Sequence, residues 1–425
     1  MVFLVATLLI LIIIGVPIAF AMGLSSIFYI LIFFDTDQLI MATQRLVAGI
    51  DSFALLALPL FILAGGIMAE GDITNRLLRL ARAMVGSIRG GLAMVMVVSS
   101  MLFGALSGSG TADVAAIGSV VLPAMKKNGY DMDFSAALLG CAGALATIIP
   151  PSLVLIVLGV ITETSIGKLF IGGIVPGILA GVCLMGYAYF YSRKMGYPKD
   201  EAFSLRNVIS SLRGAFLSLV TGVIIIGGIL GGVFTATEAA AAAVGYVLIL
   251  GVFVYRTITF KKLVRILIET AEITAIILFI ISSASLFGWV MAAERIPQAL
   301  ADFFLSISTN YYVLLLLINL LILILGIFME TLAIIIIVVP VLLPIVQIMG
   351  MDLVHFGVML CLNLAVGANT PPVGIDLLTA CRMANTRLED ASRRVGFMVA
   401  AMLVSLILVM FIPGLVTFLP NLLME

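Results

Sequence analysis

The sequence predicts an all-α polytopic membrane protein made of two inverted repeats, each with a re-entrant helical hairpin and a broken transmembrane helix. Of the 425 residues, 63% are hydrophobic and 10% are charged, whereas a soluble globular chain is about 25% charged. Charge-free runs near or above the ~20 residues that a membrane-crossing helix needs follow one another along the chain. A pattern of prolines and acidic residues then recurs at one fixed distance, which indicates the internal repeat.

The expected membrane spans are read from these charge-free runs. The first run has no basic segment before it, so we expect a retained span, tilted or kinked at Pro17, rather than a cleaved signal peptide. The runs cover residues 2–34, 52–69, 134–162, 169–192, 214–237, 239–255, 273–293, 353–381 and 395–420.

Two further apolar stretches do not fit as simple crossings. Residues 90–125 carry Asp113 in their middle, and residues 303–351 carry Glu330. We expect each to enter the membrane and return on the same side, as hairpins at 90–125 and 311–348. With these hairpins and a cytoplasmic N-terminus, 19 of the 22 Lys and Arg residues fall on the cytoplasmic side, as the positive-inside rule requires. The sequence therefore predicts a multi-pass bacterial inner-membrane protein with a periplasmic C-terminus.

The internal repeat has a constant offset of 221 residues. Pro123 recurs as Pro344, Asp131 recurs as Asp352, and the pair at 150–151 recurs at 371–372. The predicted organisation is an N-terminal scaffold span and loop at 1–52, a first repeat at 53–192 with a broken helix at 134–162, a linker with scaffold spans at 193–272, and a second repeat at 273–425 with a broken helix at 353–381. A short amphipathic arm is expected in each repeat, near 71–89 and 294–308.

The two Pro-Pro pairs predict helix breaks within apolar spans. Proline removes a backbone donor and clashes with the preceding turn, so residues 146–152 and 367–374 should be unwound. Such backbone is tolerated at membrane depth where protein buries it or where it lines a wet cavity. Broken helices at matching positions of two repeats are typical of binding sites in secondary transporters. A simple kink at each proline pair is the alternative.

The expected hairpin tips, at 107–111 and 326–331, combine glycine with Ser and Thr. Exposed carbonyls and hydroxyls are oxygen ligands that a hard cation such as sodium prefers. A small-residue motif for helix packing has the same composition and is the alternative.

Acidic residues within the apolar segments are the other candidates. Glu330, which matches Ser109 at the 221 offset, is a functional candidate as an intramembrane carboxylate, unless a local partner satisfies it. For Asp113, a functional role and burial with a local partner are equally expected. Asp376 and Glu163 are expected to cap or pair, and the single histidine, His355, to lie at the membrane interface.

An enzyme is disfavoured by the motifs that are absent from the sequence. Ser107 and Ser109 lack the surroundings of a G-x-S-x-G nucleophile, and no lysine completes a phosphate-binding loop. The four cysteines have no metal or redox spacing. A net charge of zero gives no indication of nucleic acid as a partner.

Three motifs carry a resemblance to a known family. The stretches SGSGTADVAAIGS (107–119), IIPPS (148–152) and TPPVG (370–374) resemble the large membrane (M) subunit, DctM-like, of tripartite ATP-independent periplasmic (TRAP) transporters, and the similarity covers essentially the whole chain. It looks closest to the sialic-acid branch. The resemblance implies an elevator mechanism, in which the hairpins and broken helices form a mobile transport domain and the other spans form a scaffold.

The resemblance also implies ligands and site residues. Two or more sodium ions would act as coupling ions, held between each hairpin tip and the facing helix break. Carried over by position, one sodium site takes Ser107, Ser109, Thr147 and Pro150, the other takes Gly326, Gly367, Thr370 and Pro372, and the substrate contacts Ser109, Ser152 and Glu330.

The resemblance finally implies partners and a substrate class. A small membrane (Q) subunit and a periplasmic substrate-binding protein would be separate polypeptides, and the imported molecule would be a small organic acid, with sialic acid (N-acetylneuraminate) as the first expectation. A C4-dicarboxylate transporter of the same family and a stand-alone sodium/carboxylate symporter of similar fold are alternatives. A membrane enzyme and a channel are alternatives from other classes.

Overall fold

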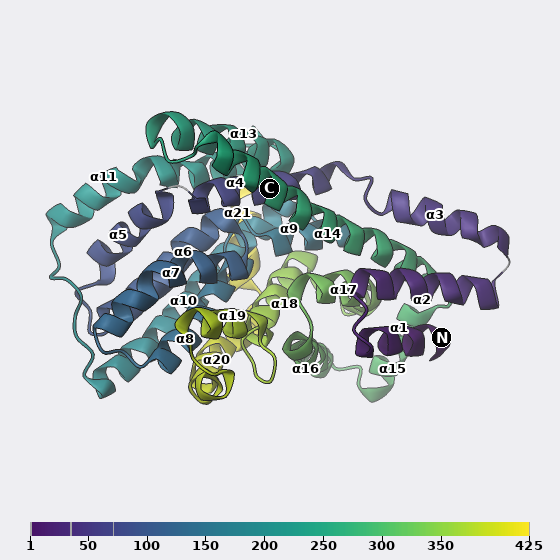
Figure 1. The fold of residues 1–425 in the computed structure, drawn as a ribbon. Helices are drawn as coiled ribbons and strands as arrows, with labels where there is room; N and C mark the ends of the chain where they lie inside the picture. The colour runs from purple at the N-terminus through teal and green to yellow at the C-terminus, as the bar shows by residue number, and fades with distance from the viewer. Residues whose placement is uncertain (1, 35, 71, 425) are drawn as a thin grey trace.

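The computed structural model describes residues 2–34, 36–70 and 72–424, and within them all regular elements are helices (Figure 1). Eight helical segments of this part of the chain are long and apolar enough to cross a membrane. The predicted all-α polytopic class is therefore confirmed. The segments are Phe53–Glu70, Ile166–Met195, Leu205–Leu230, Ala236–Val254, Phe260–Ala293, Tyr311–Phe328, Thr331–Ile348 and Leu388–Phe411.

Each repeat has the same order of elements: a span, a short arm, a hairpin, a broken helix and a closing span. The first comprises α4 (Ala57–Glu70), α5 (Ile73–Val85), α6 (Gly91–Ser107), α7 (Gly110–Lys127), α8 (Met132–Gly143), α9 (Leu153–Ile161) and α10 (Ile166–Met195). The second comprises α14 (Phe260–Ala293), α15 (Ile296–Ile307), α16 (Tyr311–Phe328), α17 (Thr331–Ile348), α18 (Leu353–Gly367), α19 (Ile375–Ala384) and α20 (Leu388–Phe411).

The remaining helices lie outside these two repeats. They are α1 (Val2–Ile13), α2 (Ile18–Phe33) and α3 (Leu39–Ala48) at the N-terminus, α11 (Leu205–Gly222), α12 (Gly228–Leu230) and α13 (Ala236–Ile249) between the repeats, and α21 (Gly414–Leu423) at the C-terminus. Figure 1 shows α2 and α3 near one end of the molecule, where they pack on α14, and α5 packed on α11 near the opposite end.

The 221-residue offset in the sequence corresponds to equivalent helix starts in the two repeats. Asp131 is the N-cap of α8 and accepts a hydrogen bond from the Asp133 N–H at 3.0 Å. Asp352, 221 residues later, is the N-cap of α18 and accepts one from the His355 N–H at 2.8 Å. The first backbone N–H groups of a helix lack partners within it, and a carboxylate at the N-cap supplies one.

The N-terminal run differs from its prediction. Instead of one kinked span over 2–34, the structure has two helices, α1 and α2, which pack against each other. Gly15 adopts a φ of +86° and Pro17 cannot continue the ladder of α1, so the chain reverses and the Phe3 and Phe33 rings lie 5.5 Å apart. At ~1.5 Å per residue, both helices are shorter than the ~30 Å hydrocarbon layer.

Because a single crossing by this run was the basis for placing the N-terminus, the side on which each terminus lies stays a prediction.

Two other helices cover residues that were not predicted to be helical. α14 begins 13 residues before the expected span at 273–293, and its 34 residues make it about 51 Å long. α3 lies where a loop was expected.

Candidate functional site

Each hairpin packs glycine against a helix break. In the first repeat the Gly108 carbonyl accepts a hydrogen bond from the Leu153 N–H at 3.2 Å, and a Cβ added to Gly108 would lie 2.7 Å from the Pro151 carbonyl oxygen. In the second repeat a Cβ added to Gly326 would lie 3.1 Å from the Gly367 Cα. Only glycine permits such close approach of two backbones, so both hairpin tips touch the breaks that they were expected to face.

The two breaks interrupt the α-helix completely. No α-helical residue occurs between Gly143 and Leu153, where a short 3₁₀ turn precedes the prolines, or between Gly367 and Ile375. Each break contains a cis peptide bond within its proline pair. The alternative of a simple kink is therefore wrong for both breaks.

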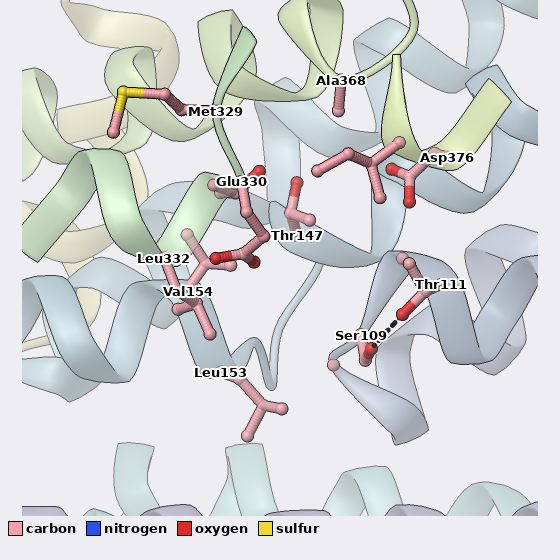
Figure 2. Close-up of a pocket in the computed structure, with 14 residues that line it drawn as sticks. Ser109, Thr111, Thr147, Leu153, Val154, Met329, Glu330, Leu332, Ala368 and Asp376 are labelled. Atoms are coloured by element: carbon pink, nitrogen blue, oxygen red, sulfur yellow. Dashed lines mark hydrogen bonds between the residues drawn. The ribbon is translucent and has the colours of Figure 1, made fainter. Parts of the chain in front are cut away.

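The tips and breaks of both repeats converge on one cavity of about 80 Å³ (Figure 2). At roughly 10 to 15 Å³ for each water, this space holds several waters or ions. It is lined by Gly108, Ser109, Gly110 and Thr111 of the first tip, Thr147, Leu153 and Val154 of the first broken helix, Met329, Glu330, Thr331 and Leu332 of the second tip, and Ala368, Ile375 and Asp376 of the second broken helix.

Oxygen atoms from both repeats surround this cavity. Figure 2 shows Ser109, Thr147 and Glu330 on different sides of the same space, with the Ser109 and Thr111 hydroxyls 3.4 Å apart. Asp376 contributes a second carboxylate, and among the described residues no Lys, Arg or His lines the cavity. The polar side chains that line the cavity are therefore carboxylates and hydroxyls, the oxygen groups that a hard cation prefers.

Three of the predicted site residues line this cavity: Ser109, Thr147 and Glu330. Ser109 and Glu330 are the N-caps of α7 and α17, and the Glu330 carboxylate also accepts a hydrogen bond from the Ala333 N–H at 3.1 Å. The predicted residues that do not line it are Ser107, Pro150, Ser152, Gly326, Gly367, Thr370 and Pro372.

Ser152, predicted to contact substrate, makes its hydrogen bonds within the first break. Its hydroxyl donates to the Thr147 carbonyl at 2.6 Å and accepts from the Leu155 N–H at 3.4 Å. The side chain is fully buried and caps α9. Thr370 similarly donates to the Val366 carbonyl at 2.8 Å.

Asp376 lines the cavity although the sequence interpretation did not assign it to the site. It was expected to cap or pair, but its carboxylate lies against the first hairpin: a Cβ added to Gly110 would be 3.0 Å from Asp376 Oδ2. The carboxylate of the second broken helix therefore lies beside the first tip. Asp113 is fully buried beside Ser100 and Asp376, and within the described residues neither of its oxygens makes a well-formed hydrogen bond. Its place shortly after the second Pro-Pro break is the sequence feature that could have indicated Asp376 as a site residue.

Two further polar residues singled out in the sequence, His355 and Glu163, do not line this cavity. His355, expected at the membrane interface, is buried between α18 and α20, with its Nε2 2.9 Å from the Val409 carbonyl oxygen. Glu163 is exposed in the turn between α9 and α10 with a φ of +53°.

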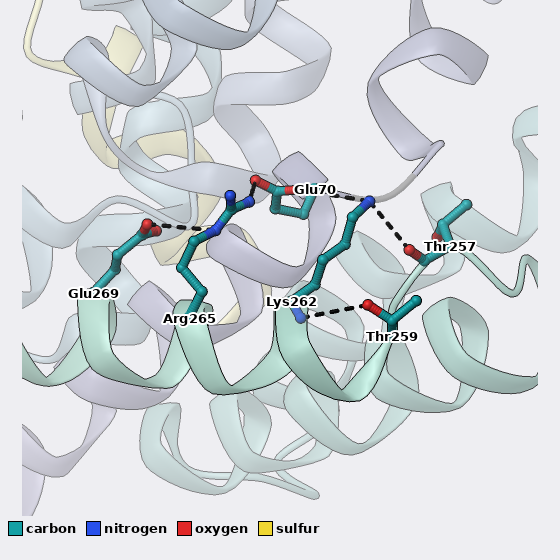
Figure 3. A network of polar contacts seen from close by, with 6 residues as sticks. All are labelled: Glu70, Thr257, Thr259, Lys262, Arg265 and Glu269. Carbon is teal, nitrogen blue, oxygen red and sulfur yellow. Dashed lines mark hydrogen bonds and ion pairs between the residues drawn. The ribbon is translucent and has the colours of Figure 1, made fainter.

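A second cavity of about 420 Å³ adjoins the first and shares Ser109 and Leu153 with it. It lies between hairpin 1, α4 and α14, and Ser107 lines it. Its lining also includes Glu70 and Glu269, which belong to the ionic network of Figure 3.

This network joins the end of α4 to the start of α14. Arg265 of α14 pairs with Glu70, and its Nε lies 3.7 Å from Glu269. The Lys262 Nζ lies 3.7 Å from Glu70 and donates to the Thr257 carbonyl at 3.3 Å. The two carboxylates that line the larger cavity, Glu70 and Glu269, are therefore paired with cations at the start of α14.

Comparison with known proteins places this arrangement in a family. The profile described as "Tripartite ATP-independent periplasmic transporter, DctM component" matches residues 5–415. The sialic acid TRAP transporter large permease protein SiaM of Vibrio cholerae is 41% identical over 408 residues, covering 96% of this chain and 95% of that protein. The C4-dicarboxylate TRAP transporter large permease protein DctM of Pseudomonas aeruginosa is 40% identical, covering 94% of each chain.

A third relative is the isethionate TRAP transporter permease protein DctMQ of Oleidesulfovibrio alaskensis. It is 42% identical over 407 residues, and the match covers 96% of this chain but 64% of that longer protein. The fold is also similar to the solved structure of the YdaH transporter of Alcanivorax borkumensis, with a TM-score of 0.62, 15% identity and 89% of each chain covered.

Relatives of similar identity are named for different substrates, so the sialic-acid branch stays a prediction. All three are named as transporter permeases, which makes the chain a permease subunit rather than an enzyme. The chain belongs to the DctM component family of tripartite ATP-independent periplasmic transporters.

Proposed function

We propose that this chain couples the inward movement of sodium to the import of a small organic acid that a periplasmic substrate-binding protein delivers. The observation that carries the proposal is the convergence of both tips and both breaks on one cavity. That cavity presents Glu330, Asp376 and the hydroxyls of Ser109 and Thr147.

Electrostatics supports sodium as the coupling ion. An organic acid is an anion, and the ionised carboxylates of Glu330 and Asp376 would repel it strongly in a low-dielectric site. Among the described residues no cationic side chain lines the cavity to offset this repulsion. Sodium ions bound at the tips would supply the missing positive charge, so substrate binding would depend on sodium.

The division of the fold supports a proposal of transport by an elevator motion. In this proposal the hairpins and broken helices, α6–α9 and α16–α19, move together against a scaffold that includes α4, α11, α13 and α14. The 420 Å³ cavity connects Ser109 with Glu70 and Glu269, next to the Lys- and Arg-rich end of α14. The positive-inside rule assigns that end to the cytoplasm, so this cavity would be the release path.

The assembly would have two further components in the bacterial inner membrane and periplasm. Relatives named as TRAP permeases support a separate small membrane subunit and a periplasmic binding protein as partners. Sialic acid remains our first substrate, and a C4-dicarboxylate is the alternative, because both kinds of relative are about equally similar.

Uptake into proteoliposomes tests the substrate and the partners. The chain would be reconstituted with its small membrane subunit, and radiolabelled N-acetylneuraminate would be supplied with and without the binding protein. Uptake that requires the binding protein supports the proposal. Uptake of succinate instead would move the substrate to the C4-dicarboxylates, and uptake without a binding protein would favour a stand-alone symporter.

A further inference from the structure

A small basic pocket lies away from the transport cavity, between the arm helix α5 and helix α11. It has a volume of about 140 Å³, and its lining consists of Arg76, Arg79, Ser210, Ser211 and Gly214. The pocket therefore presents two guanidinium groups and two hydroxyl groups. The pocket is large enough for a phosphate group.

The two arginines of the pocket are only partly neutralised. Asp72 is shared between them, with its Oδ2 3.2 Å from Arg76 Nε and 3.6 Å from Arg79 Nη2. Arg76 is held in place because its Nη1 donates to the Gly214 carbonyl at 3.1 Å and its guanidinium lies 4.1 Å from the centre of the Tyr255 ring. Two positive charges therefore face one negative charge, and Arg79, with 62% of its side chain exposed, remains free to bind a ligand.

The side of α11 opposite the pocket residues is apolar and exposed. Leu205, Ile209, Leu212 and Phe216 form a stripe at helical spacing along it, and all four are exposed. Arg206 and Arg213, seven residues apart and also exposed, lie between this stripe and the pocket on the helical period. Within the described residues neither arginine belongs to an ion pair with a carboxylate. A basic rim thus separates a basic pocket from an exposed apolar stripe.

We propose that this pocket binds the phosphate of an anionic phospholipid. Arginine binds phosphate through paired, charge-assisted hydrogen bonds, and basic pockets at the cytoplasmic side of membrane helices bind anionic headgroups. The acyl chains would pass around α11 beyond Arg206 and Arg213 to reach the apolar stripe. Because α5 links α4 to the first hairpin, a lipid bound between α5 and α11 braces this arm against α11.

Native mass spectrometry of the full detergent-purified chain tests the proposal, with phosphatidylglycerol compared with phosphatidylcholine. We expect wild type to bind phosphatidylglycerol more tightly. The double variant Arg79→Gln/Ser211→Asp should weaken that binding about tenfold or more, because it removes one positive charge and adds one negative charge beside the anionic headgroup. Arg393→Gln changes an exposed arginine of α20 that forms no ion pair with a carboxylate within the described residues, so it is the matched control and should bind normally.

Thermal stability gives a second measurement that does not depend on the double variant. Phosphatidylglycerol should raise the melting temperature of wild type and of Arg393→Gln, and should raise that of Arg213→Glu much less. Equal binding by the double variant and wild type would overturn the proposal, as would an equal loss in the Arg393→Gln control. Displacement of the lipid by millimolar inorganic phosphate would instead show a site for a soluble anion.

Discussion

Ser109 and Glu330 occupy equivalent positions in the two repeats, because each is the N-cap of the second helix of its hairpin and the two are 221 residues apart. Both line the same cavity. The inverted repeats therefore place a hydroxyl and a carboxylate on opposite sides of one space. The two residues have the same place in their repeats but different side-chain chemistry. A site that binds a cation and an anion together needs such unlike groups around one space.

Replacing Glu330 by Gln should abolish most transport. The amide keeps an oxygen for the Ala333 N–H but removes the negative charge, so we expect sodium-driven uptake to fall at least about tenfold, which corresponds to about 1.4 kcal/mol. The melting temperature should be unchanged. Glu272→Gln, at an exposed position of α14, is the control and should transport normally. Normal uptake by Glu330→Gln would show that the carboxylate is not part of the site.

Removing a hydroxyl from the first tip or break should weaken sodium binding. Ser109→Ala and Thr147→Ala each delete an oxygen at the cavity, and we expect the sodium concentration for half-maximal uptake to rise about five- to tenfold. Ser119→Ala serves as control, because that exposed hydroxyl on α7 bonds the Ala116 carbonyl. Unchanged sodium dependence in both variants would remove these hydroxyls from the ligand set.

Gly326→Ala should separate the second hairpin from its break. A methyl group there would lie 3.1 Å from the Gly367 Cα, and overpacking of this kind costs about 1 to 3 kcal/mol. The melting temperature should therefore fall. Gly396→Ala in α20 is the matched control, since a Cβ there meets no atom within 4 Å, and it should be neutral or stabilising. Equal stability of the two variants would contradict the close contact.

Ser152→Ala should act through folding rather than through substrate recognition. The serine caps α9 and bonds the Thr147 carbonyl, and losing a cap costs about 1 kcal/mol. We expect a lower melting temperature with little change in the apparent affinity for substrate. A large loss of affinity at unchanged stability would restore the direct substrate contact that the sequence resemblance implied.

The breaks and hairpins could be predicted because each depends on local chemistry. Pro-Pro pairs cannot continue a helix, and a carboxylate in the middle of an apolar stretch marks a functional or re-entrant segment. The N-terminal hairpin could not be predicted, because Gly15 and Pro17 permit either a kink or a reversal. Packing of Phe3 near Phe33 accompanies the reversal.

The composition of the site was harder to predict than its location. Asp376 lies in sequence far from the first hairpin, and only the fold brings its carboxylate beside Gly110. Ser152 carries the expected hydroxyl, but its local backbone supplies both of its hydrogen-bond partners. Sequence shows which polar groups enter the membrane, whereas tertiary packing decides which of them face the cavity.

The most direct test of the central claim is accumulation of N-acetylneuraminate in proteoliposomes that contain the complete three-component system. An inward sodium gradient would be compared with an equal inward potassium gradient. The account predicts accumulation above the external concentration with sodium only, and its loss when an ionophore collapses the sodium gradient. Equal accumulation with potassium, or accumulation that survives collapse of the sodium gradient, would contradict sodium coupling.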